Sequence, residues 1–119
     1  MKRGHRELKA WQESIALVGS IYRIAAAFPR DEQFGLISQM RRAATSVPAN
    51  IAEGAARGGT RELIHFLSIA SGSPSEPDTH IEVAKTLGIL ADTREMQGEI
   101  DRVSALVLAL AKSLRTRDR

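Results

Sequence analysis

Apolar residues recur along the chain in steps of three and four, which is the spacing of one face of an α-helix. The clearest row lies near the start and comprises Leu8, Trp11, Ile15, Val18, Tyr22 and Ala25. A second row with the same spacing occupies the same segment and comprises Leu17, Ile21, Ile24 and Phe28. At about 100° per residue, the centres of the two rows lie about 130° apart around one helix, which we place at 7–28.

Two apolar rows on one helix exceed what a single buried face requires. We therefore predict that the second row contacts another copy of the chain, so that Leu17, Ile21, Ile24 and Phe28 are subunit contacts. The alternative is that helices of the same chain wrap this segment more fully than usual. The sequence leaves both interpretations open.

Three further segments have the same periodicity and predict helices at about 34–56, 61–88 and 93–115. Pro48 lies within the second segment without shifting its apolar row, which predicts a kinked helix instead of an end. Four amphipathic helices joined by short connections predict one all-α domain, residues 1–119, folded as an up-down-up-down four-helix bundle. The basic residues after 115 form a C-terminal tail.

Two prolines interrupt the third predicted helix. Pro74 and Pro77 occupy positions where the apolar row between Leu67 and Ile81 requires a core residue. Two arrangements fit this pattern. Ser73 caps a restarted helix with Pro74 at its first position, or one long helix bends. We favour a single helix that is distorted or broken between Ser71 and Pro77.

Composition narrows the possible environments of the chain. The sequence has no cysteine, which excludes disulfides and thiolate metal sites. No stretch approaches the roughly 20 apolar residues of a membrane span, and the first residues lack the apolar run of a signal peptide. These features predict a cytoplasmic protein without membrane contact. The net charge of +3 permits contact with nucleic acid but does not require it.

The stretch "SVPANIAEGAARGG" raises the question of a phosphate-binding loop. Such a loop follows a strand, opens a helix and usually carries a lysine. Here the apolar row continues to Ile51, and the paired glycines Gly58 and Gly59 come after it. The pattern therefore predicts a helix followed by a turn.

The sequence offers little support for catalysis. Glu62 and His65 have the Glu-x-x-His spacing of di-metal sites in helical bundles, but those sites use two such pairs and the chain has one. No serine or histidine arrangement suggests a nucleophile. We predict a non-enzymatic protein without metal, cofactor or small-molecule substrate.

Arginines are the strongest candidates for a binding role. Four of them lie in the second predicted helix or around the turn after it, and we predict that they contact phosphate groups of nucleic acid. They are Arg41, Arg42, Arg57 and Arg61. Further basic residues lie at the two ends of the chain, namely Lys2, Arg3, Arg6, Lys9, Lys112, Arg115, Arg117 and Arg119. The alternative is a solvated surface with ion pairs inside helices.

A polar row lies beside the apolar row of the second predicted helix. It comprises Arg42, Ser46, Asn50 and Glu53. We predict that Asn50 and Glu53 contact a partner or another subunit, because Pro48 bends the helix within this row. The alternative is that the row only keeps one face hydrated.

Several segments resemble one known family. They are "LKAWQ", "FGLISQMRRAATSVPANIAEGAAR", "FLSIASGS" and "LGIL". The chain is similar over nearly its whole length to the proteins encoded in intervening sequences of bacterial 23S ribosomal RNA genes. A related branch is the accessory protein of diversity-generating retroelements. The chain departs from the family pattern at Pro74 and Pro77, where leucines are usual.

This resemblance implies a four-helix bundle that forms homo-oligomers, characteristically pentamers, and it implies binding or scaffolding instead of catalysis. Our leading hypothesis is a self-associating bundle that presents a basic surface to ribosomal or other structured RNA, or to an RNA-bound protein. The alternative is a protein-binding oligomeric scaffold without nucleic-acid contact.

Overall fold

The computed structural model describes residues 4–32, 35–72 and 75–117. These residues form helices and turns with no strand among them, which confirms the predicted all-α class. The elements are η1 (Gly4–Glu7), α1 (Lys9–Ala26), η2 (Arg30–Glu32), α2 (Leu36–Ala56), α3 (Thr60–Gly72), α4 (Ser75–Thr86) and α5 (Arg94–Arg117).

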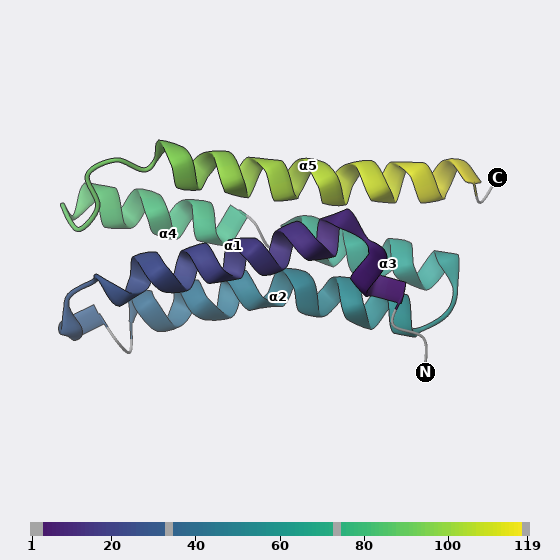
Figure 1. Ribbon diagram of the computed structural model, residues 1–119, viewed down its shortest axis with the longest axis horizontal. Coiled ribbons are helices and arrows are strands. Elements are labelled where there is room, and N and C mark those ends of the chain that lie inside the picture. The colour runs from purple at the N-terminus through teal and green to yellow at the C-terminus, as the bar shows by residue number, and fades with distance from the viewer. Residues whose placement is uncertain (1–3, 33–34, 73–74, 118–119) are drawn as a thin grey trace.

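The helices lie side by side along an elongated molecule of 48 × 26 × 18 Å. Helix α1 contacts α2 and α5, while α3 and α4 follow one another and both contact α2 and α5. The direction of the chain reverses from α1 to α2, from α2 to α3 and from α4 to α5 (Figure 1). As a result, the N-terminus, the turn between α2 and α3 and the C-terminus lie at the same end of the molecule.

The third predicted helix is divided, so the described part of the chain has five α-helices where the sequence predicts four. Helix α3 ends at Gly72 and α4 begins at Ser75, so the third predicted helix is broken within the interval from Ser71 to Pro77, where we expected it to be distorted or broken. Pro77 is fully buried in the first turn of α4. The backbone N–H groups in the first turn of a helix have no acceptor within that helix. Proline, which has no N–H group, therefore costs the helix no hydrogen bond at this position, and a helix that restarts at Ser75 tolerates Pro77. Ser73 and Pro74, the proposed cap, lie outside the described residues.

Helix α2 runs without interruption through Pro48, which is buried. The expectation that Pro48 does not end the helix is confirmed, and the kink stays a prediction. Phe34, where we place the start of this helix, lies outside the described residues, and α2 begins at Leu36.

The glycines after Pro48 serve packing and a turn. A Cβ atom on Gly54 would lie 2.7 Å from the Cβ of Phe66, so only glycine allows α2 and α3 to approach so closely there. Gly58 has a φ of +81°, a left-handed conformation that favours glycine after the end of a helix. The glycine-rich stretch is therefore the end of a helix and a turn, as predicted.

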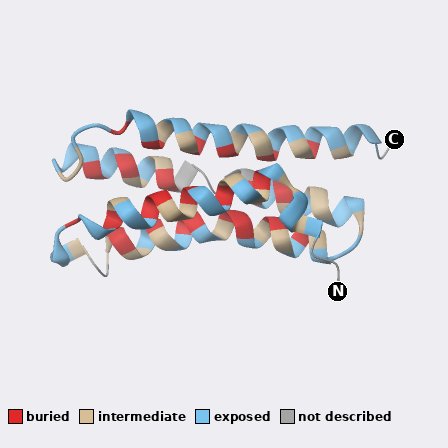
Figure 2. Cartoon of the chain, in the orientation of Figure 1, coloured by how far each residue is buried: buried red, intermediate tan, exposed pale blue. Residues whose placement is uncertain are grey.

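The core corrects our interpretation of α1. Leu17 is 1% exposed and Ile21 and Phe28 are also buried, because they pack against helices of the same chain. Ile24 is half-buried against this core. The row that we assigned to subunit contact therefore belongs mainly to the chain's own interior (Figure 2). The other row carries the exposed apolar residues, since Ile15 is 44% and Tyr22 is 42% exposed.

Candidate interaction surfaces

Arg41 lies in the groove between α1 and α2. Its guanidinium carbon is 4.7 Å from the centre of the Tyr22 ring on α1, a cation–π distance. Arg41 is half-buried, so part of its charge is directed at this ring instead of at solvent. Arg41 therefore contributes to contact between α1 and α2.

Arg42 points to a different side of α2. It lines a hollow of about 310 Å³ between α2 and α4, together with Gln39, Ser46 and His80. Successive residues on a helix point in directions about 100° apart, which explains why Arg41 and Arg42 do not act on the same surface.

The polar row of α2 is bonded largely within the helix. The Asn50 amide donates a hydrogen bond of 2.7 Å to the Ser46 carbonyl, and the Ser46 hydroxyl donates one of 2.7 Å to the Ala43 carbonyl. Glu53 accepts a hydrogen bond of 3.0 Å from Arg57 and forms an ion pair with it. A contact role for Asn50 and Glu53 stays a prediction.

The four predicted arginines do not form one cluster. Arg57 lies about 24 Å further along α2 than Arg41, at about 1.5 Å per residue. There its guanidinium carbon stacks 5.2 Å from the centre of the Phe66 ring. Arg61 is exposed in the first turn of α3, close to Arg57 in the chain. Only Arg57 and Arg61 share an end of the molecule.

That end gathers basic residues from three parts of the chain, because the termini and the turn between α2 and α3 meet there (Figure 1). We call it the basic end, and its described cationic residues are Arg6, Lys9, Arg57, Arg61, Lys112, Arg115 and Arg117. The carboxylates of the same segments are Glu7, Glu53 and Glu62. Positive charge is therefore in excess, and it stays in excess after Glu53 is paired with Arg57.

The basic end also holds the single tryptophan of the chain. The Arg6 guanidinium carbon lies 5.5 Å from the centre of the Trp11 ring, and the His5 ring meets the Trp11 ring edge-on at 5.1 Å. Trp11 is half-buried. Its fluorescence is therefore a probe of the surroundings of this end.

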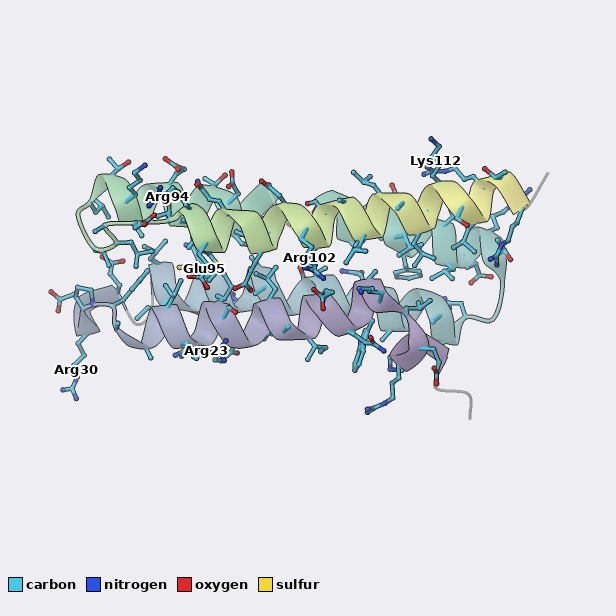
Figure 3. The ribbon with its side chains drawn as sticks, turned by 45° about the horizontal axis from the view of Figure 1, so that its top comes forward. Arg23, Arg30, Arg94, Glu95, Arg102 and Lys112 are labelled. Carbon is cyan, nitrogen blue, oxygen red and sulfur yellow. The ribbon has the colours of Figure 1, made fainter. Side chains whose placement is uncertain are left out.

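The opposite end has a more even balance, with Arg30, Arg94 and Glu95 far from Lys112 (Figure 3). Its carboxylates are Asp31, Glu32, Glu82, Asp92, Glu95 and Glu99, and its cationic residues are Arg23, Arg30, Arg41, Arg42, Lys85 and Arg94. Asp92 accepts hydrogen bonds from the Arg94 side chain at 2.9 and 3.1 Å and from the Arg94 backbone amide at 3.0 Å. These bonds hold the pKa of Asp92 below its ordinary value.

Polar contacts between α1 and α5 were not apparent from the sequence. Arg102 forms an ion pair of 2.8 Å with Glu13, and the Ser20 hydroxyl donates a hydrogen bond of 3.2 Å to Glu99. These partners lie more than 70 residues apart in the chain, so no local spacing signals them.

Two strips of exposed apolar residues run along the molecule. The α1 strip consists of Ile15 and Tyr22, and no exposed residue between Lys9 and Arg23 is charged. The α3–α4 strip consists of Ile69, Val83 and Leu87. Leu108 of α5 is also exposed and belongs to neither strip.

The described residues contain no group of three or more histidine, aspartate or glutamate side chains placed to hold a metal ion. Glu62 and His65 are both exposed on α3, and His65 contacts the edge of the Phe66 ring. Within the same described residues, no helix combines the length and apolarity needed to cross a membrane.

These features define a class: an all-helical protein of antiparallel helices with one basic end. Within that class, the chain belongs to the family of 23S rRNA-intervening sequence proteins, whose model matches residues 6–109. A similar solved structure is a protein of unknown function from the S23 ribosomal protein family of Bacteroides thetaiotaomicron VPI-5482. The two chains are 18% identical, with a TM-score of 0.75 over 87% of this chain and 98% of the other. No curated protein sequence matches the chain.

Proposed function

We propose that the protein is a non-enzymatic, self-associating helical module that binds structured RNA through its basic end. In this proposal the fold is a four-helix bundle in which α3 and α4 together fill the third position. The family's name connects such chains with 23S rRNA intervening sequences, which makes ribosomal RNA the first partner to test.

The observation that carries the RNA proposal is the excess of positive charge at the basic end. Phosphate groups of RNA attract clustered cationic residues, and the attraction comes mainly from the release of counterions. Lys9, Arg61 and Arg115 lie far apart in the sequence, yet their segments meet at this end. Several phosphates of one RNA can therefore be contacted at the same time.

The predicted phosphate contacts change accordingly. Arg57 and Arg61 belong to the basic end and keep their proposed role. Arg41 is held against Tyr22, and Arg42 lies on the side of the molecule beside His80. We propose that Arg41 and Arg42 contribute less to RNA affinity than the residues of the basic end.

The self-association proposal is supported by the α1 strip. Exposed apolar side chains such as Ile15 and Tyr22, on a helix face whose own exposed positions carry no charge, are typical of protein–protein contacts. We expect a homo-oligomer in solution, with five copies as the first state to test. A scaffold that binds only protein is the alternative, and it would use the same strip without the basic end.

Filter binding of a ribosomal RNA fragment across a salt series tests the RNA proposal. Log affinity should fall against log salt with a slope of about −0.7 to −0.9 per phosphate contact. Replacing Arg57, Arg61 and Arg115 by alanine should weaken binding and make this slope shallower by about two to three units. Quenching of Trp11 fluorescence gives an independent readout.

The matched control replaces Arg30, Lys85 and Arg94 by alanine, because it removes the same charge from the opposite end. This control should retain most of the affinity and the steep slope. Equal losses in the two variants would show a diffuse attraction and contradict a site at the basic end. No binding at low salt would leave the protein scaffold as the function.

A further inference from the structure

A hollow lies between the end of α1 and the first half of α2, at the end of the molecule opposite to the basic end. Its volume is about 310 Å³. It is lined by Ala25, Ala26, Phe28, Arg30, Ile37 and Arg41. Two of these described residues carry a positive charge and none of them carries a carboxylate, so the hollow attracts anions.

Arg41 brings to this hollow a hydrogen-bond donor that lacks an acceptor among the described residues. The donor is its Nε atom, which is buried. A buried donor without an acceptor is costly, and folded proteins contain few of them. An acceptor that enters the hollow and draws the guanidinium group towards it would remove this cost.

The ring of Tyr22 holds Arg41 without using its N–H groups. The guanidinium carbon lies 4.7 Å from the centre of the ring, so the ring attracts the positive charge as a whole. The N–H groups keep the fixed fork that pairs with both oxygens of a carboxylate. Because the ring already holds the side chain, binding a carboxylate costs less ordering at Arg41 than at a mobile arginine.

Arg30 provides a second positive charge at the rim of the hollow. It belongs to η2, and its side chain extends away from the helices (Figure 3). Within the described part of the chain, neither Arg30 nor Arg41 forms an ion pair with a carboxylate. Arg30 can therefore turn towards an anion beside Arg41 without breaking an ion pair.

The rest of the described lining is apolar. Ala25, Phe28 and Ile37 are core residues that also line the hollow. A carboxylate held by the two arginines would therefore place the neighbouring part of its molecule over an apolar surface. Ligand sites commonly combine such a surface with a few charged groups that fix the orientation of the ligand.

We propose that this hollow binds a carboxylate that has an apolar group beside it, as in a free carboxylic acid or at the C-terminus of a peptide that ends in leucine. Arg41 donates two hydrogen bonds to the carboxylate, one of them from Nε, and Arg30 pairs with it from the rim. The apolar group rests against Phe28 and Ile37. This site is separate from the basic end and depends neither on RNA binding nor on self-association.

The surroundings of the hollow favour a single carboxylate over the phosphates of RNA. Asp31 and Glu32 follow Arg30 directly in η2. A polynucleotide with one phosphate in the hollow would bring its next phosphates towards these two carboxylates, and like charges repel. A lone carboxylate brings no second charge, so this repulsion is smaller.

Titration of the unchanged protein with N-acetyl-leucine, followed by proton–nitrogen NMR at constant ionic strength, tests the proposal. The Arg41 Nε–H resonance should shift downfield and saturate at millimolar concentration, because its proton gains an acceptor. N-acetyl-leucinamide has the same apolar group without the charge, and it should cause no saturable shift. Equal shifts from the two compounds would contradict recognition of a carboxylate.

Substitutions test the two arginines, with binding of N-acetyl-leucine measured at the backbone amide of Ile37. Arg41→Gln should weaken binding by at least about tenfold, and Arg30→Gln by about threefold, because water screens a charge at the rim. Arg42→Gln is the matched control, since Arg42 is the next residue of α2 but lines a different hollow. It should change the affinity by less than about twofold. Equal losses for Arg41→Gln and Arg42→Gln would show a diffuse attraction of anions and overturn the proposal.

Circular dichroism checks that the variants are folded. If Arg41→Gln loses its helical signal, Arg41→Lys provides a milder change, because lysine keeps the charge but lacks the fork of N–H groups. This variant should still weaken binding of N-acetyl-leucine several-fold. An unchanged affinity would mean that Arg41 does not hold the carboxylate.

Further probes distinguish the sources of the anion. Hexanoate that binds as tightly as N-acetyl-leucine would assign the hollow to free carboxylic acids, whereas weaker binding of hexanoate would assign it to a peptide terminus. Tighter binding of isoamyl phosphate, or displacement of N-acetyl-leucine by the ribosomal RNA fragment, would overturn the carboxylate and assign the hollow to phosphate. Failure of RNA binding in the filter assay would leave these results unaffected, because the hollow and the basic end share no residue.

Discussion

Helices α1 and α5 are antiparallel neighbours that pack in the same way against the core but present different side chains to solvent. Each buries one apolar row against the rest of the molecule (Figure 2). The residues of α1 that are exposed between Lys9 and Arg23 are Gln12, Ile15, Ala16 and Tyr22. The exposed charged residues of α5 are Arg94, Glu95, Asp101, Arg102, Lys112, Arg115 and Arg117.

This difference separates what the fold requires from what it leaves for other uses. The buried rows stabilise the single chain, whereas the outward faces add little to its stability. Removing water from charged side chains is costly, so the outward face of α5 is suited to solvent or to a polyanion. The outward face of α1 can lose its water at small cost, which suits it to contact with protein.

The largest effect that we predict separates the two faces of α1. Leu17→Ala removes a side chain that is 1% exposed, and it should lower the free energy of unfolding by about 3 kcal/mol. Ile15→Ala should cost less than about 0.5 kcal/mol under conditions where the chain is monomeric, because its side chain remains largely in water there. Urea unfolding of the two variants at low protein concentration measures both values.

Concentration provides the control for this comparison. If the α1 strip is a subunit contact, raising the protein concentration should increase the difference in midpoint between Ile15→Ala and the unchanged chain. The cost of Leu17→Ala should change much less with concentration. A concentration-independent Ile15→Ala would mean that the strip is ordinary solvent-exposed surface.

The periodicity of the sequence could predict the helices but not the orientation of α1. Both of its rows have helical spacing and similar apolarity, so the sequence provides no reason to choose between Leu17 and Ile15 as the core position. The choice depends on how α2 and α5 pack, and those helices lie far away in the chain. Extra apolar surface on α1 could be predicted, but its location could not.

Two further features could not be predicted from spacing along the sequence. One is the break between α3 and α4, and the other is the gathering of basic residues at the basic end. The apolar row continues in phase through Pro77, so spacing alone does not distinguish one bent helix from two. The basic end depends on the reversal of successive helices, which brings Arg61 near the terminal segments. Local spacing instead made the neighbours Arg41 and Arg42 look like one site, although they point to different grooves.

A smaller effect is expected from the ion pair that joins α1 to α5. The ion pair between Glu13 and Arg102 has a distance of 2.8 Å, but Arg102 is largely exposed. A double-mutant cycle with Glu13→Gln and Arg102→Gln should give a coupling free energy of about 0.5 kcal/mol, decreasing with added salt. A coupling of several kcal/mol would mean that this groove, and not the apolar packing beneath it, fixes α5 against α1.

The smallest effect lies at the start of α5, where Asp92 and Arg94 form an ion pair at the surface and 61% of the Asp92 side chain is exposed. Hydrogen bonds from Arg94 lower the pKa of Asp92 below its ordinary value of 3.8. The folded chain therefore releases this proton more readily than the unfolded chain, so the stabilising contribution is present above that ordinary value and is lost as the pH falls through the folded pKa. Arg94→Gln should raise the pKa of Asp92 towards its ordinary value in an NMR titration of the carboxyl carbon, while Arg102→Gln should leave it unchanged. A pKa of Asp92 that responds equally to both substitutions would mean that the outward charges of α5 act as one long-range field instead of as separate local pairs.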